Sequence, residues 1–284
     1  MNDRFSDYEL AENLQLDEER ALYGRNRLIV RGCRFDGPAD GESALKECSD
    51  IVCRKSYFNL RYPFWHDSRL EISDCEMTEL CRAALWYSSD IKISGTRLHG
   101  IKALRECSRV EITDCDILSP EFGWFSSDIT IENTTAASEY FMLKASGLRV
   151  KSLSFTGKYS FQYIKDSVFE DCTFMTKDAF WHSSNVLVKN SVVNGEYLAW
   201  YSDGLTLENC LITGTQPLCY CSNLRLINCR TSGCDLSFEK SEVDAEISGE
   251  IISIKNPASG VIRASGCQEI IRDDPKSRCE IIIG

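Results

Sequence analysis

The sequence predicts an all-β fold, a single-stranded right-handed parallel β-helix that winds about nineteen residues into each coil. Three observations lead to this prediction. A short apolar phrase returns along most of the chain at multiples of nineteen residues, a turn-forming residue follows it at a fixed distance, and two further apolar segments complete the repeat. Strands and turns that alternate with one fixed period are typical of a solenoid whose stacked coils share a core.

The recurring phrase consists of two apolar residues separated by one other residue, and it usually follows Ser-Asp or Ser-Asn. Its clearest copies begin at Ile91, Val110, Ile129, Leu148, Val186, Leu205 and Leu224. Earlier copies begin at Leu28, Ile51 and Leu70, and segment 37–41 (GPADG) is the obvious insertion that lengthens a coil there. Later copies at Val243, Ile262 and Ile281 keep the step of nineteen in degenerate surroundings. Because alternating apolar residues have the period of a strand, each phrase predicts a short strand with one face inward.

The rest of each coil follows from two further columns. Four residues after the phrase begins stands Asp, Asn or Gly, as at Asp114, Asn190 and Asn209, and such residues tolerate left-handed backbone. The next position holds a cysteine in six coils, namely Cys33, Cys75, Cys115, Cys172, Cys210 and Cys229. These cysteines are predicted to be small buried fillers with reduced thiols. With the two later apolar segments, each coil is predicted to hold three short strands.

Two other repeat folds compete with the β-helix. A leucine-rich repeat also shows an apolar pair followed by Asn or Cys, but its coils close with a helix or loop, whereas the closing segments here carry β-formers and aromatics. A left-handed hexapeptide helix would show a six-residue subperiod, and none is visible. We therefore expect one domain over residues 1–284, with an N-terminal cap in 1–20, regular coils in 21–240, and degenerate coils with a C-terminal cap in 241–284.

The composition restricts the classes of partner. A formal net charge of −11 argues against a nucleic-acid or anionic-membrane surface, which would need a cationic face. The first residues lack the apolar core of a secretory signal, which favours a cytoplasmic protein. No cofactor or metal is predicted, because the fifteen cysteines have a structural explanation and the pair Cys219 and Cys221 lacks the spacing of a zinc site.

Several short segments of the sequence resemble those of a known bacterial family. They are segments 19–22 (ERAL), 40–47 (DGESALKE), 62–65 (YPFW), 82–87 (RAALWY), 177–181 (KDAFW), 195–198 (GEYL), 218–220 (LCY), 243–247 (VDAEI) and 255–260 (KNPASG). In this order they are similar to the domain-of-unknown-function family 3737. The resemblance implies a right-handed parallel β-helix related in shape to pectin-lyase-like proteins. It implies no established activity and no catalytic residues.

Candidate binding residues lie in two adjacent columns just before the phrase. They are Trp65, His66, Trp86, Tyr87, Arg105, Glu106, Trp124, Trp181, His182, Trp200 and Tyr201. All five tryptophans of the chain share one of these columns. Adjacent strand residues point to opposite faces unless a turn intervenes, so the sequence leaves open which column faces outward. Since Lys46 and Arg105 share the tryptophan column, and Glu47 and Glu106 the other, at least one must reach the surface.

Two interpretations of these columns stay open. A stripe of aromatic and charged side chains suits a saccharide, whose apolar faces stack on Trp while its hydroxyls meet acids and His. A ladder of like side chains that stabilises successive coils, with Arg105 stacked on Trp86 or Trp124, is the structural interpretation and is favoured. His66 and His182 lie six coils apart, too far to cooperate, and no catalytic motif stands out.

The carboxylates give a weak signal for catalysis. Asp67, Asp90, Asp128, Asp166 and Asp203 lie near the phrase, but most alternate with Arg69, Arg109 or Gly147, which dilutes a calcium site. The first hypothesis is therefore a non-catalytic scaffold that binds a saccharide or a protein partner along the stripe. The alternatives are a carbohydrate-active lyase or hydrolase that acts along it, and a structural, self-associating solenoid. The sequence does not indicate the oligomeric state.

Overall fold

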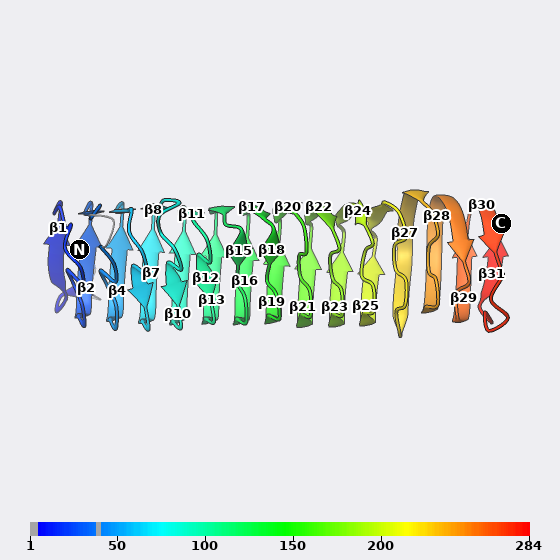
Figure 1. Cartoon of the computed structure of the whole chain (residues 1–284), viewed down its shortest axis with the longest axis horizontal. Helices are drawn as coiled ribbons and strands as arrows, with labels where there is room; N and C mark the ends of the chain where they lie inside the picture. The colour runs from blue at the N-terminus through cyan, green and yellow to red at the C-terminus, as the bar shows by residue number, and fades with distance from the viewer. Residues whose placement is uncertain (1–4, 38–40) are drawn as a thin grey trace. The chain divides into compact units, whose positions relative to one another are not determined.

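The computed structural model describes residues 5–37 and 41–284, so most of the insertion predicted at 37–41 lies outside the described residues. Regular structure in the described part is entirely β, in agreement with the predicted class, and no α-helix occurs there (Figure 1). No helix among these residues is long and apolar enough to cross a membrane. The chain forms two compact units, unit 1 (1–138) and unit 2 (139–284), and each is described by itself.

In unit 1 the recurring phrases form one strand per coil, and these strands pair in parallel. They are β1 (Glu9–Glu12), β2 (Asn26–Arg31), β4 (Ser49–Arg54), β7 (Ser68–Ser73), β10 (Ser89–Ser94), β13 (Ser108–Thr113) and β16 (Ser127–Glu132). The pairing of Leu28 with Ile51, Ile51 with Leu70 and Leu70 with Ile91 confirms the predicted steps. Within the segment 1–20 that was expected to cap the N-terminus, Glu9–Glu12 form β1, and Glu9 pairs with Leu28.

Two shorter strands complete most coils of unit 1. After the turn come β3 (Arg34–Phe35), β5 (Tyr57–Phe58), β8 (Glu76–Met77), β11 (Arg97–His99), β14 (Asp116–Leu118) and β17 (Thr135–Ser138). The third segments form β6 (Phe64–Trp65), β9 (Leu85–Trp86), β12 (Leu104–Arg105) and β15 (Glu121–Phe122). The first three of these pair in parallel as a separate sheet, β12–β9–β6. Three strands per coil are thus confirmed in unit 1.

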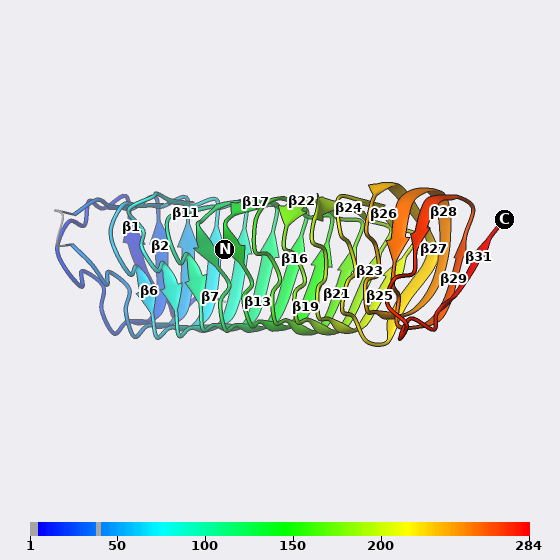
Figure 2. The ribbon, with the colours of Figure 1, turned by 45° about the vertical axis from the view of Figure 1, so that its right-hand side comes forward.

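Unit 2 repeats the first two strands of the coil. The phrases form β19 (Ser146–Lys151), β21 (Lys165–Glu170), β23 (Ser184–Lys189), β25 (Asp203–Glu208), β27 (Leu224–Cys234), β28 (Glu242–Lys255), β29 (Ser259–Ala264) and β31 (Glu280–Ile283). The second strands are β20 (Ser154–Gly157), β22 (Thr173–Lys177), β24 (Val192–Glu196), β26 (Leu211–Thr213) and β30 (Cys267–Ile271), and β18 (Tyr140–Phe141) precedes them. Figure 2 shows β19, β21, β23 and β25 side by side.

The third strand predicted for each coil is wrong for most of unit 2. Phe161, Phe180, Ala199 and Leu218 occupy the third segment with φ of 57°, 60°, 60° and 62°, and they lie in turns. A left-handed residue in the middle of the segment interrupts the extended backbone that a strand needs. These side chains are buried nonetheless, so the segment closes the core without forming a strand.

The predicted register is wrong at one degenerate coil. Val243 pairs with Gly260 and Ala245 with Ile262, so Val243 and Ile262 are not equivalent, although Ile262 does pair with Ile281. The step from Val243 to Gly260 is seventeen residues (260 − 243). β28 runs through the position of the turn as one strand of 14 residues, and a coil without that turn needs fewer residues.

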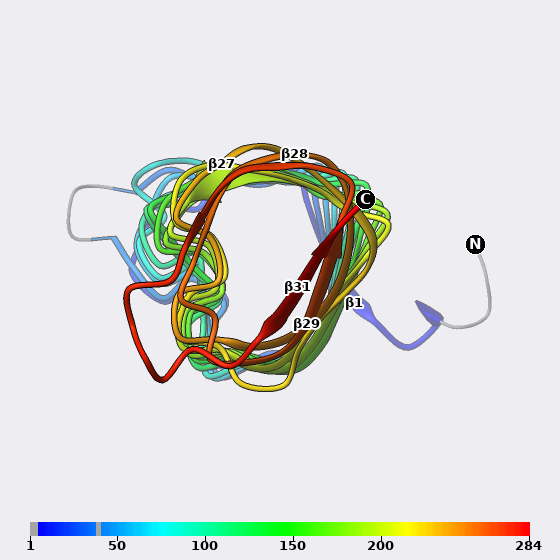
Figure 3. The same cartoon turned by 90° about the vertical axis from the view of Figure 1, so that its right-hand side faces the viewer.

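The last coils of unit 2 turn in the predicted sense. Figure 3 views this unit from its C-terminal end, and the chain turns anticlockwise as it advances toward the viewer. This is the sense of a right-handed helix.

The predicted columns occupy the predicted places. The turn residues Asp114, Asn190 and Asn209 have φ of 53°, 51° and 52°, as their residue types suggest. The six cysteines of the next column are buried, with at most 4% of their surface exposed. All fifteen cysteines are free thiols, and burial raises the pKa of Cys172 to about 11.

Candidate functional site

The two candidate columns both face outward. In every coil the second residue of the pair has a left-handed backbone, with φ of 62° at His66, 56° at Tyr87, 53° at His182 and 61° at Tyr201. A left-handed residue makes a corner, and the alternation of faces expected of a strand does not hold across it. The tryptophan column is half-buried, except for the buried Cys219, and its neighbour is mostly exposed. This resolves the question that the sequence left open.

We call these columns the inner and outer rows and describe them for each unit. In unit 1 the inner row is Lys46, Trp65, Trp86, Arg105 and Trp124, and the outer row is Glu47, His66, Tyr87, Glu106 and Phe125. In unit 2 the inner row is Leu143, Gln162, Trp181, Trp200 and Cys219, and the outer row is Lys144, Tyr163, His182, Tyr201 and Tyr220. The candidate residues are thus brought together in two sets, one in each unit.

The inner row of unit 1 is a stack of cations and indoles. The Lys46 ammonium lies 4.3 Å from the Trp65 ring centroid, and the Trp65 and Trp86 rings lie 5.7 Å apart with 14° between their planes. The Arg105 guanidinium carbon then lies 5.7 Å from the Trp86 centroid and 5.4 Å from that of Trp124. The predicted stacking of Arg105 is confirmed on both tryptophans. Such cation–π contacts stabilise neighbouring coils against each other.

The inner row of unit 2 is anchored differently. The Trp181 and Trp200 rings lie 5.3 Å apart and 3° from parallel. The Trp181 indole nitrogen donates to the Tyr197 carbonyl oxygen at 2.6 Å, and that of Trp200 donates to the Gln216 carbonyl oxygen at 2.8 Å. In unit 1, by contrast, the buried indole nitrogens of Trp65 and Trp86 have no partner among the described residues.

The outer row of unit 2 is a continuous stack of four polar rings. Centroid distances are 4.8 Å from Tyr163 to His182, 5.0 Å to Tyr201 and 4.9 Å to Tyr220, and the planes lie within 13° of parallel at each step. A cation lies near each end, because the Lys144 ammonium is 5.9 Å from the Tyr163 centroid and the Lys240 ammonium is 5.9 Å from that of Tyr220. Tyr163 and Tyr201 nevertheless expose 42% and 47% of their surface.

Stacking decides which chemistry the rows can offer. A ring that is stacked between two others has both of its faces covered, so solvent meets ring edges, phenol hydroxyls and imidazole nitrogens. A sugar therefore cannot lie flat on successive tryptophans as the saccharide interpretation assumed. Edges and hydroxyl groups can still donate and accept hydrogen bonds along a row.

Charged groups of the rows are engaged with neighbours. The Arg105 guanidinium lies 3.2 Å from a Glu106 oxygen, and the Tyr23 hydroxyl donates to Glu47 at 2.5 Å. That hydrogen bond raises the pKa of the Tyr23 hydroxyl. Burial and the nearby Glu239 carboxylate raise the pKa of Tyr220 in unit 2.

Asp67 does not belong to the surface, although it directly follows His66. Its side chain is only 2% exposed, and one carboxyl oxygen accepts the Cys48 backbone N–H at 2.7 Å while the other has no partner among the described residues. Burial raises the pKa of this carboxyl to about 8. Sequence reasoning grouped Asp67 with the other aspartates, but its place in the coil matches Cys48 and Cys107, which was the signal for a buried position.

Three other aspartates of that group each bind a side chain of a neighbouring coil, and Asp128 is exposed. Asp90 holds Arg109 at 2.6 Å, Asp166 accepts from Asn185 at 2.6 Å, and Asp203 accepts from Asn223 at 2.8 Å. No cluster of three or more His, Cys, Asp or Glu side chains suited to a metal occurs among the described residues. His66 belongs to unit 1 and His182 to unit 2, and His99 pairs elsewhere with Asp116 at 2.9 Å.

These features define a class of protein, a parallel β-solenoid that carries stacked aromatic and charged rows at one corner of its coils. The chain matches the family described as protein of unknown function (DUF3737) over residues 9–283, and it belongs to that family. No curated protein matches it.

Solved structures resemble it in fold alone. The A-module of Azotobacter vinelandii mannuronan C-5 epimerase AlgE6 is 10% identical, with a TM-score of 0.39, and the match covers 97% of this chain and 88% of the module. The catalytic domain of a GH87 α-1,3-glucanase in complex with nigerose is 11% identical, with a TM-score of 0.35, and the match covers 97% and 63% of the two chains. The tailspike of the E. coli bacteriophage HK620 is 8% identical, with a TM-score of 0.32 and coverage of 96% and 53%.

Proposed function

We propose that this protein is a non-catalytic binding scaffold whose outer aromatic row contacts an extended, hydroxyl-rich ligand, a saccharide in the first instance. The observation that carries the proposal is the four-ring stack of unit 2, in which Tyr163 and Tyr201 expose 42% and 47% of their surface. Stacking on both sides holds these rings in one orientation, so a ligand would lose little side-chain entropy on binding them.

The polar atoms of the row fit such a ligand. The hydroxyls of Tyr163, Tyr201 and Tyr220 and the imidazole of His182 provide donors and acceptors at the spacing of the coils, about 4.8 Å. Ring edges between them give apolar contact. A saccharide offers hydroxyl groups and C–H groups in alternation and can therefore use both.

A catalytic alternative has less support. A carboxyl held protonated near neutral pH is what a general acid requires, and Asp67 has this property. It is only 2% exposed, however, and its carboxyl contacts the Cys48 backbone below the rows. A group in that position cannot reach a ligand bound at the surface. The stacked rows therefore support binding better than lyase or hydrolase chemistry.

The test is a glycan array with the wild-type chain, followed by titration of each glycan that binds. The double variant Tyr163→Ala/Tyr201→Ala should lower affinity at least tenfold. The matched control is Tyr159→Ala, because Tyr159 stacks on Tyr140 at 4.8 Å in unit 2 but lies outside the rows. If no glycan binds, or if the double variant lowers only the melting temperature, the rows are structural. Release of reducing sugar from a bound polysaccharide would instead support an enzyme.

A further inference from the structure

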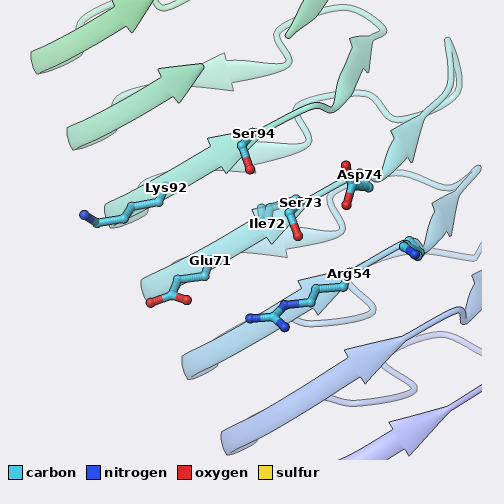
Figure 4. A pocket seen from close by; sticks show the side chains of 8 residues that line it. Arg54, Glu71, Ile72, Ser73, Asp74, Lys92 and Ser94 are labelled. Atoms are coloured by element: carbon cyan, nitrogen blue, oxygen red, sulfur yellow. The ribbon is translucent and has the colours of Figure 1, made fainter. Parts of the chain in front are cut away.

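A second surface feature lies in unit 1, on the outer face of the sheet that the phrases form. A hollow of about 610 Å³ crosses β4, β7 and β10, and its lining includes Arg54, Lys55, Glu71, Ser73, Asp74 and Ser94 (Figure 4). A smaller hollow of about 220 Å³ adjoins it and shares Glu71 and Lys92. Neither contains a residue of the aromatic rows.

The unusual feature of this hollow is a pair of cations, Arg54 and Lys55, that form no ion pair with a carboxylate of the described residues. Ten arginines of unit 1 have a carboxylate oxygen within 4.0 Å, namely Arg20, Arg25, Arg27, Arg31, Arg34, Arg61, Arg69, Arg97, Arg105 and Arg109. Among the described residues of this unit, the two remaining arginines, Arg54 and Arg82, have none. Lys55, next to Arg54, is also without an ion pair in the described part of the chain.

The backbone presents Arg54 and Lys55 together. Lys55 has a φ of 50°, so the chain turns a corner there and both adjacent side chains are exposed. The Arg54 guanidinium carbon lies 6.0 Å from the Phe5 ring centroid, a contact that orients the side chain. Lys92, the third cation of the hollow, is already paired with Glu111 at 3.0 Å.

Hydroxyl groups continue the row that Arg54 begins. Arg54 pairs in register with Ser73, and Ser73 pairs with Ser94 on the next strand. Figure 4 shows these two serines on successive strands beside the carboxyl group of Asp74. The hollow therefore combines a guanidinium fork, an ammonium and two hydroxyls as donors with the carboxylates of Glu71 and Asp74 as acceptors.

We propose that this hollow binds the tetrahedral oxyanion of a phosphate or sulfate ester carried by a polyhydroxy compound. Arg54 and Lys55 neutralise the charge, and Ser73 and Ser94 donate to the remaining terminal oxygens. The two oxygens of a carboxylate would satisfy the arginine fork and leave the other donors unused. The carboxylates of Glu71 and Asp74 repel a bare anion and can accept hydrogen bonds from hydroxyls of the ligand, which favours an ester of a polyol over the free ion. The proposal does not rest on the function proposed for the aromatic rows.

The test is calorimetric titration of the full chain with glucose 6-phosphate, glucose 6-sulfate and glucose at one fixed ionic strength. At least one ester should bind measurably tighter than glucose. Arg54→Gln/Lys55→Gln should weaken that binding at least tenfold, and Lys55→Gln alone should weaken it less. Both side chains are exposed, so these variants should keep the wild-type melting temperature.

The control is Arg82→Gln, which removes the other arginine of unit 1 without a carboxylate and should leave binding unchanged. The two esters identify the source of the oxyanion. A phosphate ester gains its second charge near pH 6, so its binding should strengthen from pH 5 to pH 7.5, whereas binding of the sulfate ester should not change. Equal binding of esters and glucose, unchanged binding in the double variant, or an equal loss in Arg82→Gln would overturn the proposal.

Discussion

Trp181 and Trp200 lie 5.3 Å apart with 3° between their ring planes, and each also donates its indole N–H to a backbone carbonyl of the next coil, Trp181 to Tyr197 and Trp200 to Gln216. One side chain therefore joins coils in two ways, by ring contact and by hydrogen bond. The Trp200 ring also contacts the outer row, since it meets the Tyr201 and Tyr220 rings edge to face.

Replacement of Trp200 should destabilise unit 2. Trp200→Ala removes the stack on Trp181 and the bond to Gln216, so we expect the free energy of unfolding to fall by about 2–4 kcal/mol. Trp200→Phe keeps a ring and loses only the indole N–H, so its loss should be smaller. Urea unfolding curves of both variants measure this, and an unchanged midpoint for Trp200→Ala would contradict a structural role for the row.

Asp67 should make stability depend on pH. Its pKa is about 8 in the folded chain against about 3.9 when unfolded, so the folded state binds the proton more tightly. The stabilisation is complete below about pH 4 and is lost as the pH rises from about 4 to about 8. Asp67→Asn should therefore flatten the fall in stability between pH 5 and pH 8.

The measurement is the free energy of unfolding at these two pH values. A suitable control is Asp90→Asn, because the Arg109 guanidinium lowers the pKa of Asp90 and this carboxyl stays charged through the whole range. Curves for wild type and Asp67→Asn that run parallel would show that the Asp67 carboxyl titrates normally.

The thiols should be protected in the native protein. Burial raises the pKa of Cys81 and Cys107 to about 12, and of the fifteen cysteines only Cys267 is partly exposed. A thiolate is the reactive species, so a thiol reagent at pH 8 should modify about one cysteine in the native chain and all fifteen in denaturant. Cys267→Ser should abolish the native reaction. Rapid modification of several thiols without denaturant would mean that the core opens readily.

The sequence predicted the features that repeat and missed those that depend on a single backbone angle. The recurring apolar phrase, the turn residue and the cysteine return every nineteen residues, so each coil gives separate evidence for the same fold. His66 and Tyr87 have φ of 62° and 56°. Asn or Gly in the turn column signals such a left-handed backbone, but His and Tyr do not, so the sequence could not show which face these residues lie on. Asp67 was misplaced for a related reason, since the corner at His66 turns the following residue inward.

The stability that the turn residues contribute should come more from their backbone conformation than from their side-chain hydrogen bonds. Asn209 has a φ of 52°, donates to the Asn190 side-chain oxygen at 3.2 Å and accepts from the Asn228 side-chain nitrogen at 2.8 Å. Asn209→Ala removes both bonds and places a Cβ residue without local compensation in left-handed backbone, so we expect a loss of about 1–2 kcal/mol. Asn209→Gly also removes both bonds but relieves the strain. If strain dominates, unfolding experiments will rank the glycine variant above the alanine variant and near the wild type in stability. A glycine variant as unstable as the alanine variant would contradict the dominant role of backbone strain.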